Sequence, residues 1–222
     1  MPSPPTQKPR LDITGAIVPA LAAAVAAAIG TLFLVGHLPD AATPPPENCI
    51  LQGAEQVGGP IALIDTHGQR VTQADFHQQP AILYFGFTHC PDVCPTTMYA
   101  LAQALAAPGG YDIQPVLITI DPQRDTPQVL SQYVRTNGFP AGLQGLTGTA
   151  AQVQAAEAAF RVYSHVAPVE GAPSDVYNVD HTSFLYVMDG QWRTRAIVNS
   201  AQATPAQIAQ CIAAGLSRRD RS

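Results

Sequence analysis

The sequence predicts an α/β domain built of three layers. From residue 79 onward, apolar runs typical of buried strands alternate with segments of helical periodicity. This alternation ends in a strand pair and a last helix, and a short hairpin precedes it. An uncharged stretch near the N-terminus adds one predicted transmembrane helix before the domain.

The N-terminal stretch "GAIVPALAAAVAAAIGTLFLVG", residues 15–36, contains no charged residue. As a helix it would span about 33 Å, which is enough to cross a bilayer core. A cleavable signal peptide usually has a shorter apolar core, so we expect an uncleaved anchor. Lys8 and Arg10 precede the stretch, and the next basic residue after it is Arg70. The positive-inside rule therefore places the N-terminus in the cytoplasm.

These features divide the chain into a cytoplasmic segment 1–14, an anchor 15–37, a Pro-rich linker 38–57, a domain 58–217 and a tail 218–222. Because the N-terminus does not resemble an Arg/Ser-rich import leader, we expect a bacterial inner-membrane protein whose soluble domain faces the periplasm. That compartment permits disulfides, and the chain has four cysteines. The net charge is −5 and no basic stripe is present, so nucleic acid is not an expected partner.

The elements of the domain follow from local patterns. Two short apolar runs around residues 66–68 predict a hairpin within 58–76. The near-continuous apolar run 79–87 is typical of a strand buried on both faces, and 96–107 has the spacing of a helix. Thr126 and Pro127 mark a helix start. We further expect strands at 114–120 and 142–148, helices at 125–138 and 149–160, an extended segment at 161–169, a strand pair at 181–189 and 191–199 joined at Asp189-Gly190, and a helix from Pro205.

The stretch "YFGFTHCPDVCPTTM", residues 84–98, places Cys90 and Cys94 where the first buried strand meets its helix. Open sheets bind their ligands at this end of their strands. On one helix face the two Cβ atoms would lie about 5–6 Å apart, which suits a disulfide or two ligands of one metal ion. A helix N-terminus would also lower the pKa of both thiols. A redox pair, a metal site and a structural disulfide all remain open at this point.

Two thiolates favour a soft metal, Cu(I) above all, with zinc as a competitor. Imidazole is a suitable third ligand, and His165 and His181 are the histidines best placed to supply it. His181 stands at the entry to a buried strand after a Gly/Pro/Ser loop, where a ligand can be delivered on a mobile arm. A capped or solvated histidine is the alternative for His181.

Three motifs, "YFGFTHCPDVCPTTM", "ITIDPQRDTP" and "VDHTSFLYVMD", together resemble the Sco/SenC family of copper-binding, thioredoxin-like proteins of cytochrome c oxidase assembly. The likeness covers about residues 58–216. It implies a thioredoxin-like domain with an N-terminal β-hairpin extension, in which Cys90, Cys94 and His181 bind Cu(I) or Cu(II). It also implies a membrane-anchored periplasmic metallochaperone, whose activity is binding rather than enzymatic turnover.

The partners implied by this resemblance are subunit II of cytochrome c oxidase, at its dinuclear copper centre, or another copper-site protein. Periplasmic copper donors or thiol reductants are further expected partners. The alternative function is a thiol–disulfide oxidoreductase that reduces partner cysteines during oxidase assembly, with Cys90 and Cys94 as its redox-active pair. The C-x-x-x-C spacing argues against it, because thioredoxin-type catalysts use C-x-x-C.

Five further residues have weaker predicted roles. Asp121, Asp125 and Asp180 are candidates for contacts that orient the ligands, although for Asp121 and Asp125 we favour a local role, in which they fix the turn and the helix start through hydrogen bonds. Cys49 and Cys211 depart from the family pattern. We expect a disulfide between them that ties the linker to the last helix, with a free Cys49 and a buried, inert Cys211 as the alternative. The aromatic residues Tyr84, Phe87 and Tyr186 are expected in the core.

Overall fold

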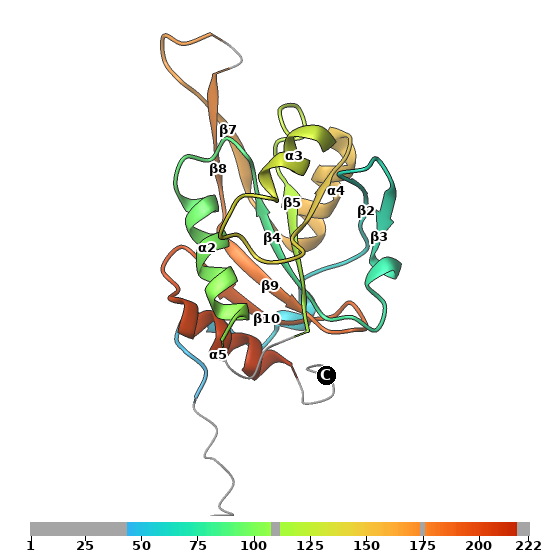
Figure 1. The fold of residues 1–222 in the computed structure, drawn as a ribbon, viewed down its shortest axis with the longest axis vertical. Helices are drawn as coiled ribbons and strands as arrows, with labels where there is room; N and C mark the ends of the chain where they lie inside the picture. The colour runs from blue at the N-terminus through green and yellow to red at the C-terminus, as the bar shows by residue number, and fades with distance from the viewer. Residues whose placement is uncertain (1–43, 108–111, 174–175, 217–222) are drawn as a thin grey trace, which may run out of the picture. The chain divides into compact units, whose positions relative to one another are not determined.

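An eight-stranded mixed sheet lies at the centre of the fold (Figure 1). The computed structural model describes residues 44–107, 112–173 and 176–216. Its elements, in chain order, are β1 (Cys49–Ile50), η1 (Ala54–Gln56), β2 (Ala62–Asp65), β3 (Arg70–Thr72), η2 (Gln73–Phe76), β4 (Ala81–Gly86), α2 (Val93–Leu105), β5 (Gln114–Thr119), α3 (Pro127–Tyr133), β6 (Gln144–Thr147), α4 (Ala150–Phe160), β7 (Ser164–Pro168), β8 (Tyr177–His181), β9 (Phe184–Met188), β10 (Thr194–Asn199) and α5 (Pro205–Gly215).

The strand order β1-β10-β9-β4-β5-β6-β2-β3 places β4 inside the sheet. All six residues of β4 are buried, and the strand pairs in parallel with β5 and antiparallel with β9. The apolar run at 79–87 predicted such a strand, because each of its faces must be covered. The expected hairpin within 58–76 is present as β2 and β3 at one edge of the sheet.

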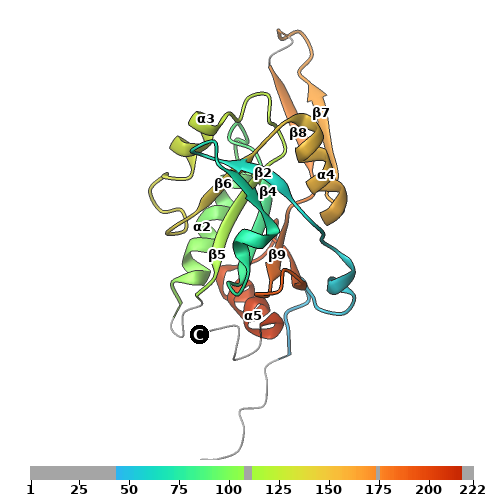
Figure 2. The same ribbon diagram turned by 90° about the vertical axis from the view of Figure 1, so that its right-hand side faces the viewer.

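Helices cover both faces of the sheet, which confirms the predicted three-layer arrangement (Figure 2). Successive residues of a strand point to opposite faces. The hydroxyl of Tyr84 therefore reaches Cys94 of α2 on one face. On the other face the ring of Phe85 packs against Phe160 of α4, with 5.4 Å between the ring centroids. Helix α5 packs beside α2 (Figure 1).

Strands β7 and β8 form a separate two-stranded antiparallel sheet, here called the arm, which projects beyond the main sheet (Figure 1). The sequence predicted an extended segment at 161–169 but not its pairing with residues 177–181. His181 ends β8 and pairs with Ser164. The expectation that His181 begins the buried strand was therefore wrong, because that strand, β9, begins only at Phe184.

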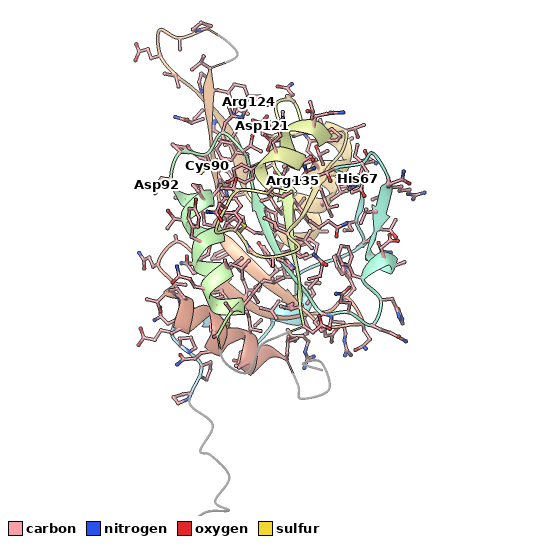
Figure 3. All side chains as sticks on the ribbon, viewed as in Figure 1. His67, Cys90, Asp92, Asp121, Arg124 and Arg135 are labelled. Atoms are coloured by element: carbon pink, nitrogen blue, oxygen red, sulfur yellow. A yellow bond between two sulfur atoms is a disulfide. The ribbon has the colours of Figure 1, made fainter. Side chains whose placement is uncertain are left out.

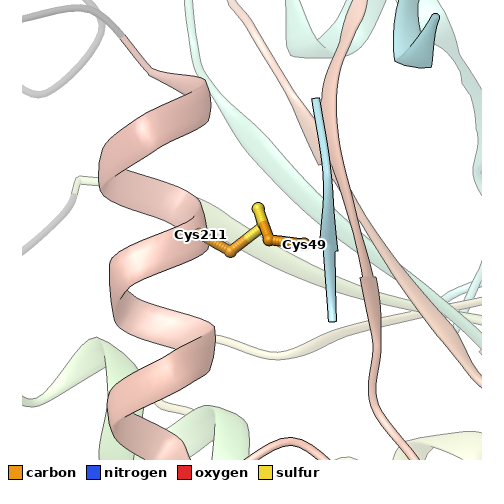
Figure 4. Close-up of a disulfide and its surroundings, with 2 residues drawn as sticks. All are labelled: Cys49 and Cys211. Atoms are coloured by element: carbon orange, nitrogen blue, oxygen red, sulfur yellow. A yellow bond between two sulfur atoms is a disulfide. The ribbon is translucent and has the colours of Figure 1, made fainter. Parts of the chain in front are cut away.

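Cys49 and Cys211 form a disulfide, with 5.6 Å between their Cα atoms (Figure 4). Cys49 belongs to β1, which pairs with β10, and Cys211 lies on the buried face of α5. The bond joins the two segments that the sequence analysis paired. Residues 49–56 were expected in the linker, yet they supply an edge strand and a 3-10 helix to the domain. The domain therefore begins before residue 58.

The predicted cytoplasmic segment 1–14, the anchor 15–37 and the tail 218–222 lie outside the described residues. Across residues 44–107, 112–173 and 176–216, no helix combines the length and the apolar composition needed to cross a membrane.

Candidate metal centre

The turn between β4 and α2 brings Cys94 against the end of the strand. Cys94 lies in the first turn of α2 and is fully buried. Gly86 ends β4 beneath it, and a Cβ atom at this position would lie 3.1 Å from the Sγ of Cys94 and 2.6 Å from a ring carbon of Tyr84. Only glycine lets the strand, the tyrosine ring and the cysteine approach so closely.

Cys90 lies before the helix rather than on its face, since α2 begins at Val93. Its Sγ accepts a hydrogen bond from the backbone N–H of Cys94, at 3.3 Å. The thiol of Cys94 holds the pKa of Cys90 down to about 4, with smaller contributions from His181 and backbone N–H groups. Cys90 is therefore a thiolate at neutral pH.

The pKa of Cys94 moves in the opposite direction. Its hydrogen bond to the Cys90 sulfur and its burial both raise this pKa, since each favours the protonated thiol. The expectation that the helix N-terminus lowers the pKa of both thiols was therefore wrong for Cys94. The pair consists of one half-buried thiolate and one buried thiol.

His181 approaches this pair from the arm. Its Nε2 lies 3.7 Å from the Sγ of Cys94, and its Nδ1 lies 2.9 Å from the carbonyl oxygen of Thr182. When Nδ1 donates its proton to that carbonyl, the lone pair of Nε2 faces the sulfurs. The rings of Phe87 and Tyr84 meet the imidazole edge-on, with centroids at 5.9 Å and 6.2 Å.

The ligand atoms of Cys90, Cys94 and His181 all lie within 4.8 Å of one another. Cys90 and His181 line a cleft of about 290 Å³ between the start of α2 and strand β8, while Cys94 lies buried beside them. Figure 3 shows Cys90 and Asp92 beside the start of α2, with Asp121 and Arg124 nearer the arm. Two sulfurs and one imidazole nitrogen form a soft donor set, which suits Cu(I). Zinc can also bind such ligands.

The predicted supporting aspartates have different positions. Asp125 is buried and accepts hydrogen bonds from the backbone and hydroxyl of Thr88 at 3.1 Å and 2.6 Å, and from the hydroxyl of Thr119 at 2.6 Å. It thereby holds the loop that leads to Cys90. Asp121 is bound to Arg124 and to Tyr177, the residue at which β8 begins after the hairpin loop. The contacts of Asp121 with Tyr177 and of Asp125 with Thr88 reach beyond the local turn, whereas the contact of Asp121 with Arg124 lies within it.

Asp180 is exposed, and the group at Nδ1 of His181 is the Thr182 carbonyl instead. His165, the other candidate histidine, is exposed on β7. Sequence reasoning missed the role of Tyr84, whose hydroxyl donates to the Sγ of Cys94 at 3.7 Å. A signal existed: a tyrosine in a strand buried on both faces needs a partner for its hydroxyl.

Several curated proteins are similar to this chain in sequence. Protein SenC of Rhodobacter capsulatus is 42% identical over 136 residues, which cover 60% of this chain and 59% of SenC. Protein SCO1 homolog 1 of Arabidopsis thaliana is 41% identical over 139 residues, which cover 61% of this chain and 40% of that protein. The chain thus spans about half the length of these curated relatives.

Two solved structures are similar over most of the domain. Arabidopsis thaliana ScoI with copper bound has a TM-score of 0.63 and 36% identity, covering 69% of this chain and 93% of its own. Bradyrhizobium japonicum ScoI with copper bound has a TM-score of 0.61 and 33% identity, covering 72% and 99%. The expected thioredoxin-like α/β fold is therefore confirmed. Because the SCO1/SenC family model matches residues 51–217, the chain belongs to the SCO1/SenC family.

Proposed function

We propose that this protein is a membrane-anchored copper metallochaperone of cytochrome c oxidase assembly. Cys90, Cys94 and His181 would hold copper as cargo and pass it by ligand exchange to the dinuclear copper centre of oxidase subunit II. The observation that carries this proposal is the convergence of two sulfurs and one imidazole nitrogen within 4.8 Å. The copper bound in the two ScoI relatives supports the choice of metal.

The same thiols would make copper binding sensitive to oxidation. Oxidation of the Cys90 thiolate and the Cys94 thiol to a disulfide releases two electrons, which an oxidant must accept, and one proton. It also removes both sulfur ligands at once. We therefore expect only the reduced protein to hold Cu(I) tightly, with periplasmic thiol reductants keeping it in that state.

Copper titration of the reduced, detergent-solubilised protein tests this function. We expect one copper per chain, a Cu(II)–thiolate absorption band, and strongly weakened binding in Cys90→Ala and His181→Ala. His165→Ala is the matched control, because His165 is an exposed histidine on the strand that pairs with β8. Copper binding that is indifferent to His181 would contradict the three-ligand site.

Thiol–disulfide exchange is a second candidate function, and the unequal cysteines favour it. Cys90 is half-buried with a lowered pKa, as an attacking thiolate should be, and Cys94 is buried beside it. Cys90 would attack a partner disulfide and release one partner thiolate. Cys94, on losing its proton, would then attack the Cys90 sulfur and release the second, leaving a Cys90–Cys94 disulfide and a reduced partner. An external thiol reductant must then regenerate the pair.

A reductase assay on an oxidised copper-site peptide separates the two functions. If the protein is an oxidoreductase, Cys90→Ser should abolish reduction of the peptide and His181→Ala should leave it intact. If it is a copper chaperone, both variants should lose copper transfer. Because both functions need Cys90, only the His181→Ala variant distinguishes them.

The location at the inner membrane, facing the periplasm, is also part of our proposal. It is supported by the uncharged stretch at 15–36 and by the Cys49–Cys211 disulfide, because disulfides persist in oxidising compartments. Fractionation of cells tests it: the full chain should sediment with membranes, and deletion of residues 1–37 should remove it from them. Protease added to spheroplasts should digest the domain, and protection of the domain would contradict the orientation.

A further inference from the structure

Arg124 lies beside the candidate metal centre and joins two segments of the fold. Its Nε donates to Oδ2 of Asp121, and its Nη1 donates to the backbone carbonyl of Tyr177 at 3.0 Å. The guanidinium carbon lies 3.6 Å from the centre of the Tyr177 ring. The Tyr177 hydroxyl completes the cluster by donating to Oδ1 of Asp121 at 2.7 Å. These contacts, here called the clamp, tie the loop after β5 to the first residue of β8. Asp121 and Arg124 are labelled in Figure 3.

The clamp requires an arginine rather than any positive charge. The Arg124 side chain is 17% exposed and that of Asp121 is 4% exposed. Among the described residues, the buried Nη2 of Arg124 meets no hydrogen-bond acceptor, and the guanidinium instead faces the rings of Tyr177 and, at 5.9 Å, Phe87. A guanidinium stacks on aromatic rings and donates in two directions at once, whereas a lysine ammonium does not.

The arm depends on contacts with the rest of the domain, because β7 and β8 pair with each other and not with the main sheet. A two-stranded hairpin is at best marginally stable alone. Tyr177 begins β8 and His181 ends it, so the clamp and the candidate ligand share one five-residue strand. Phe87 adds a second connection, since its ring lies against both Arg124 and the His181 imidazole.

We propose that Arg124 is a positioning residue for the metal centre, which holds β8 through Asp121 and Tyr177 and so places Nε2 of His181 beside Cys94. This inference rests on the proposed copper function for its affinity readout. In this proposal Arg124 and Asp121, both in the motif "DPQRD", support the metal centre without contacting the metal.

Cu(I) affinity of the reduced full chain in detergent, measured by competition with a chromophoric chelator, tests the proposal. The double variant Asp121→Asn/Arg124→Gln removes both charges, so no unpaired charge remains buried. We expect its affinity to fall about ten- to a hundredfold, as when other groups that orient metal ligands are removed. Arg124→Lys and Tyr177→Leu should also lower the Cu(I) affinity, because each removes the stacking of the guanidinium on the Tyr177 ring. Arg135→Gln, at an exposed arginine bonded to Ser131, is the matched control.

The His181→Ala background separates positioning from a general effect on the fold. With no imidazole to place, removal of the clamp should leave the remaining two-sulfur affinity unchanged. A loss of equal size in that background would overturn the proposal, as would unchanged affinity in both Asp121→Asn/Arg124→Gln and Tyr177→Leu.

An NMR readout of the copper-free protein keeps the inference separate from the proposed function. Cross-peaks between the ring protons of His181 and Phe87 should be present in the wild type and lost in the clamp variants. If wild type binds no copper, or binds it equally well without His181, the chaperone function fails, while these cross-peaks still report whether Arg124 positions the imidazole. Cross-peaks that persist in the clamp variants would refute the positioning role.

Discussion

Nε2 of His181 lies 3.7 Å from Sγ of Cys94, although 87 positions separate the two residues in the chain. Cys94 lies on the first turn of α2, and His181 lies at the end of β8, where the arm joins the rest of the domain. The two sulfurs and the imidazole nitrogen therefore come together only when both elements are in place. The geometry of the metal centre therefore depends on the contacts that hold the turn after β4 and the arm in place.

The reactivity of Cys90 should be nearly independent of pH in the neutral range. Its pKa is lowered to about 4, so in the reduced protein the thiolate persists as the pH falls from 8 to 5 and is lost only near pH 4. Iodoacetamide labelling followed by peptide mass spectrometry should give a flat rate over pH 5–8. Cys94, buried and with a raised pKa, should label far more slowly. A Cys90 rate that rises about tenfold per pH unit across this range, as for an ordinary thiol of pKa about 8.5, would contradict the lowered pKa.

Tyr84→Phe should weaken Cu(I) binding by about tenfold, the lower end of the range for groups that support metal ligands. The variant removes the hydroxyl that donates to Sγ of Cys94 and leaves the ring in place. Chelator competition measures the affinity. Tyr186→Phe is the control, because Tyr186 is an equally buried tyrosine that packs on Phe160, on the opposite face of the sheet. Equal effects of the two substitutions would mean that the Tyr84 hydroxyl has no specific role.

Loss of the Cys49–Cys211 disulfide should lower the free energy of unfolding by about 2–5 kcal/mol without changing copper stoichiometry. The bond joins residues 162 positions apart and holds β1 against α5, far along the chain from Cys90. Urea unfolding of Cys49→Ser/Cys211→Ala measures the loss. Non-reducing peptide mapping of the wild type should recover the linked peptides, and recovery of both as free thiols would show that the pair is not formed.

Asp125→Asn should destabilise the domain by about 1–3 kcal/mol, because its NH2 group replaces a carboxyl oxygen that accepts a hydrogen bond from Thr88 or Thr119 and cannot accept one itself. Burial raises the pKa of Asp125. The contribution of a group with a raised pKa is complete below its unfolded value and declines as the pH rises through its folded value. The difference between wild type and variant should therefore shrink from pH 4 to pH 7 in urea unfolding. Asp180→Asn, at an exposed aspartate, should show little effect, and a difference that grows toward pH 7 would reverse the sign of the shift.

The sequence determined those features whose causes lie within a few residues. The uninterrupted apolar run of β4 predicted a strand covered on both faces, and the structure buries all of it. Thr126 and Pro127 predicted the start of α3, and the Thr126 side chain accepts a hydrogen bond from the N–H of Val129. The position of Cys90 and Cys94 at a strand-to-helix turn follows from the same local patterns.

Only the tertiary structure decided how these parts act on one another. The pairing of β1 with β10 and the clamp at Arg124 both join segments that are distant in the chain. The opposite pKa shifts of Cys90 and Cys94 arise from burial and from hydrogen bonds across the folded centre. A local sequence pattern reflects the conformational preference of the backbone. The positions of the ligands and the pKa values of the thiols depend instead on groups distant in the chain, which bury the site and form hydrogen bonds with it.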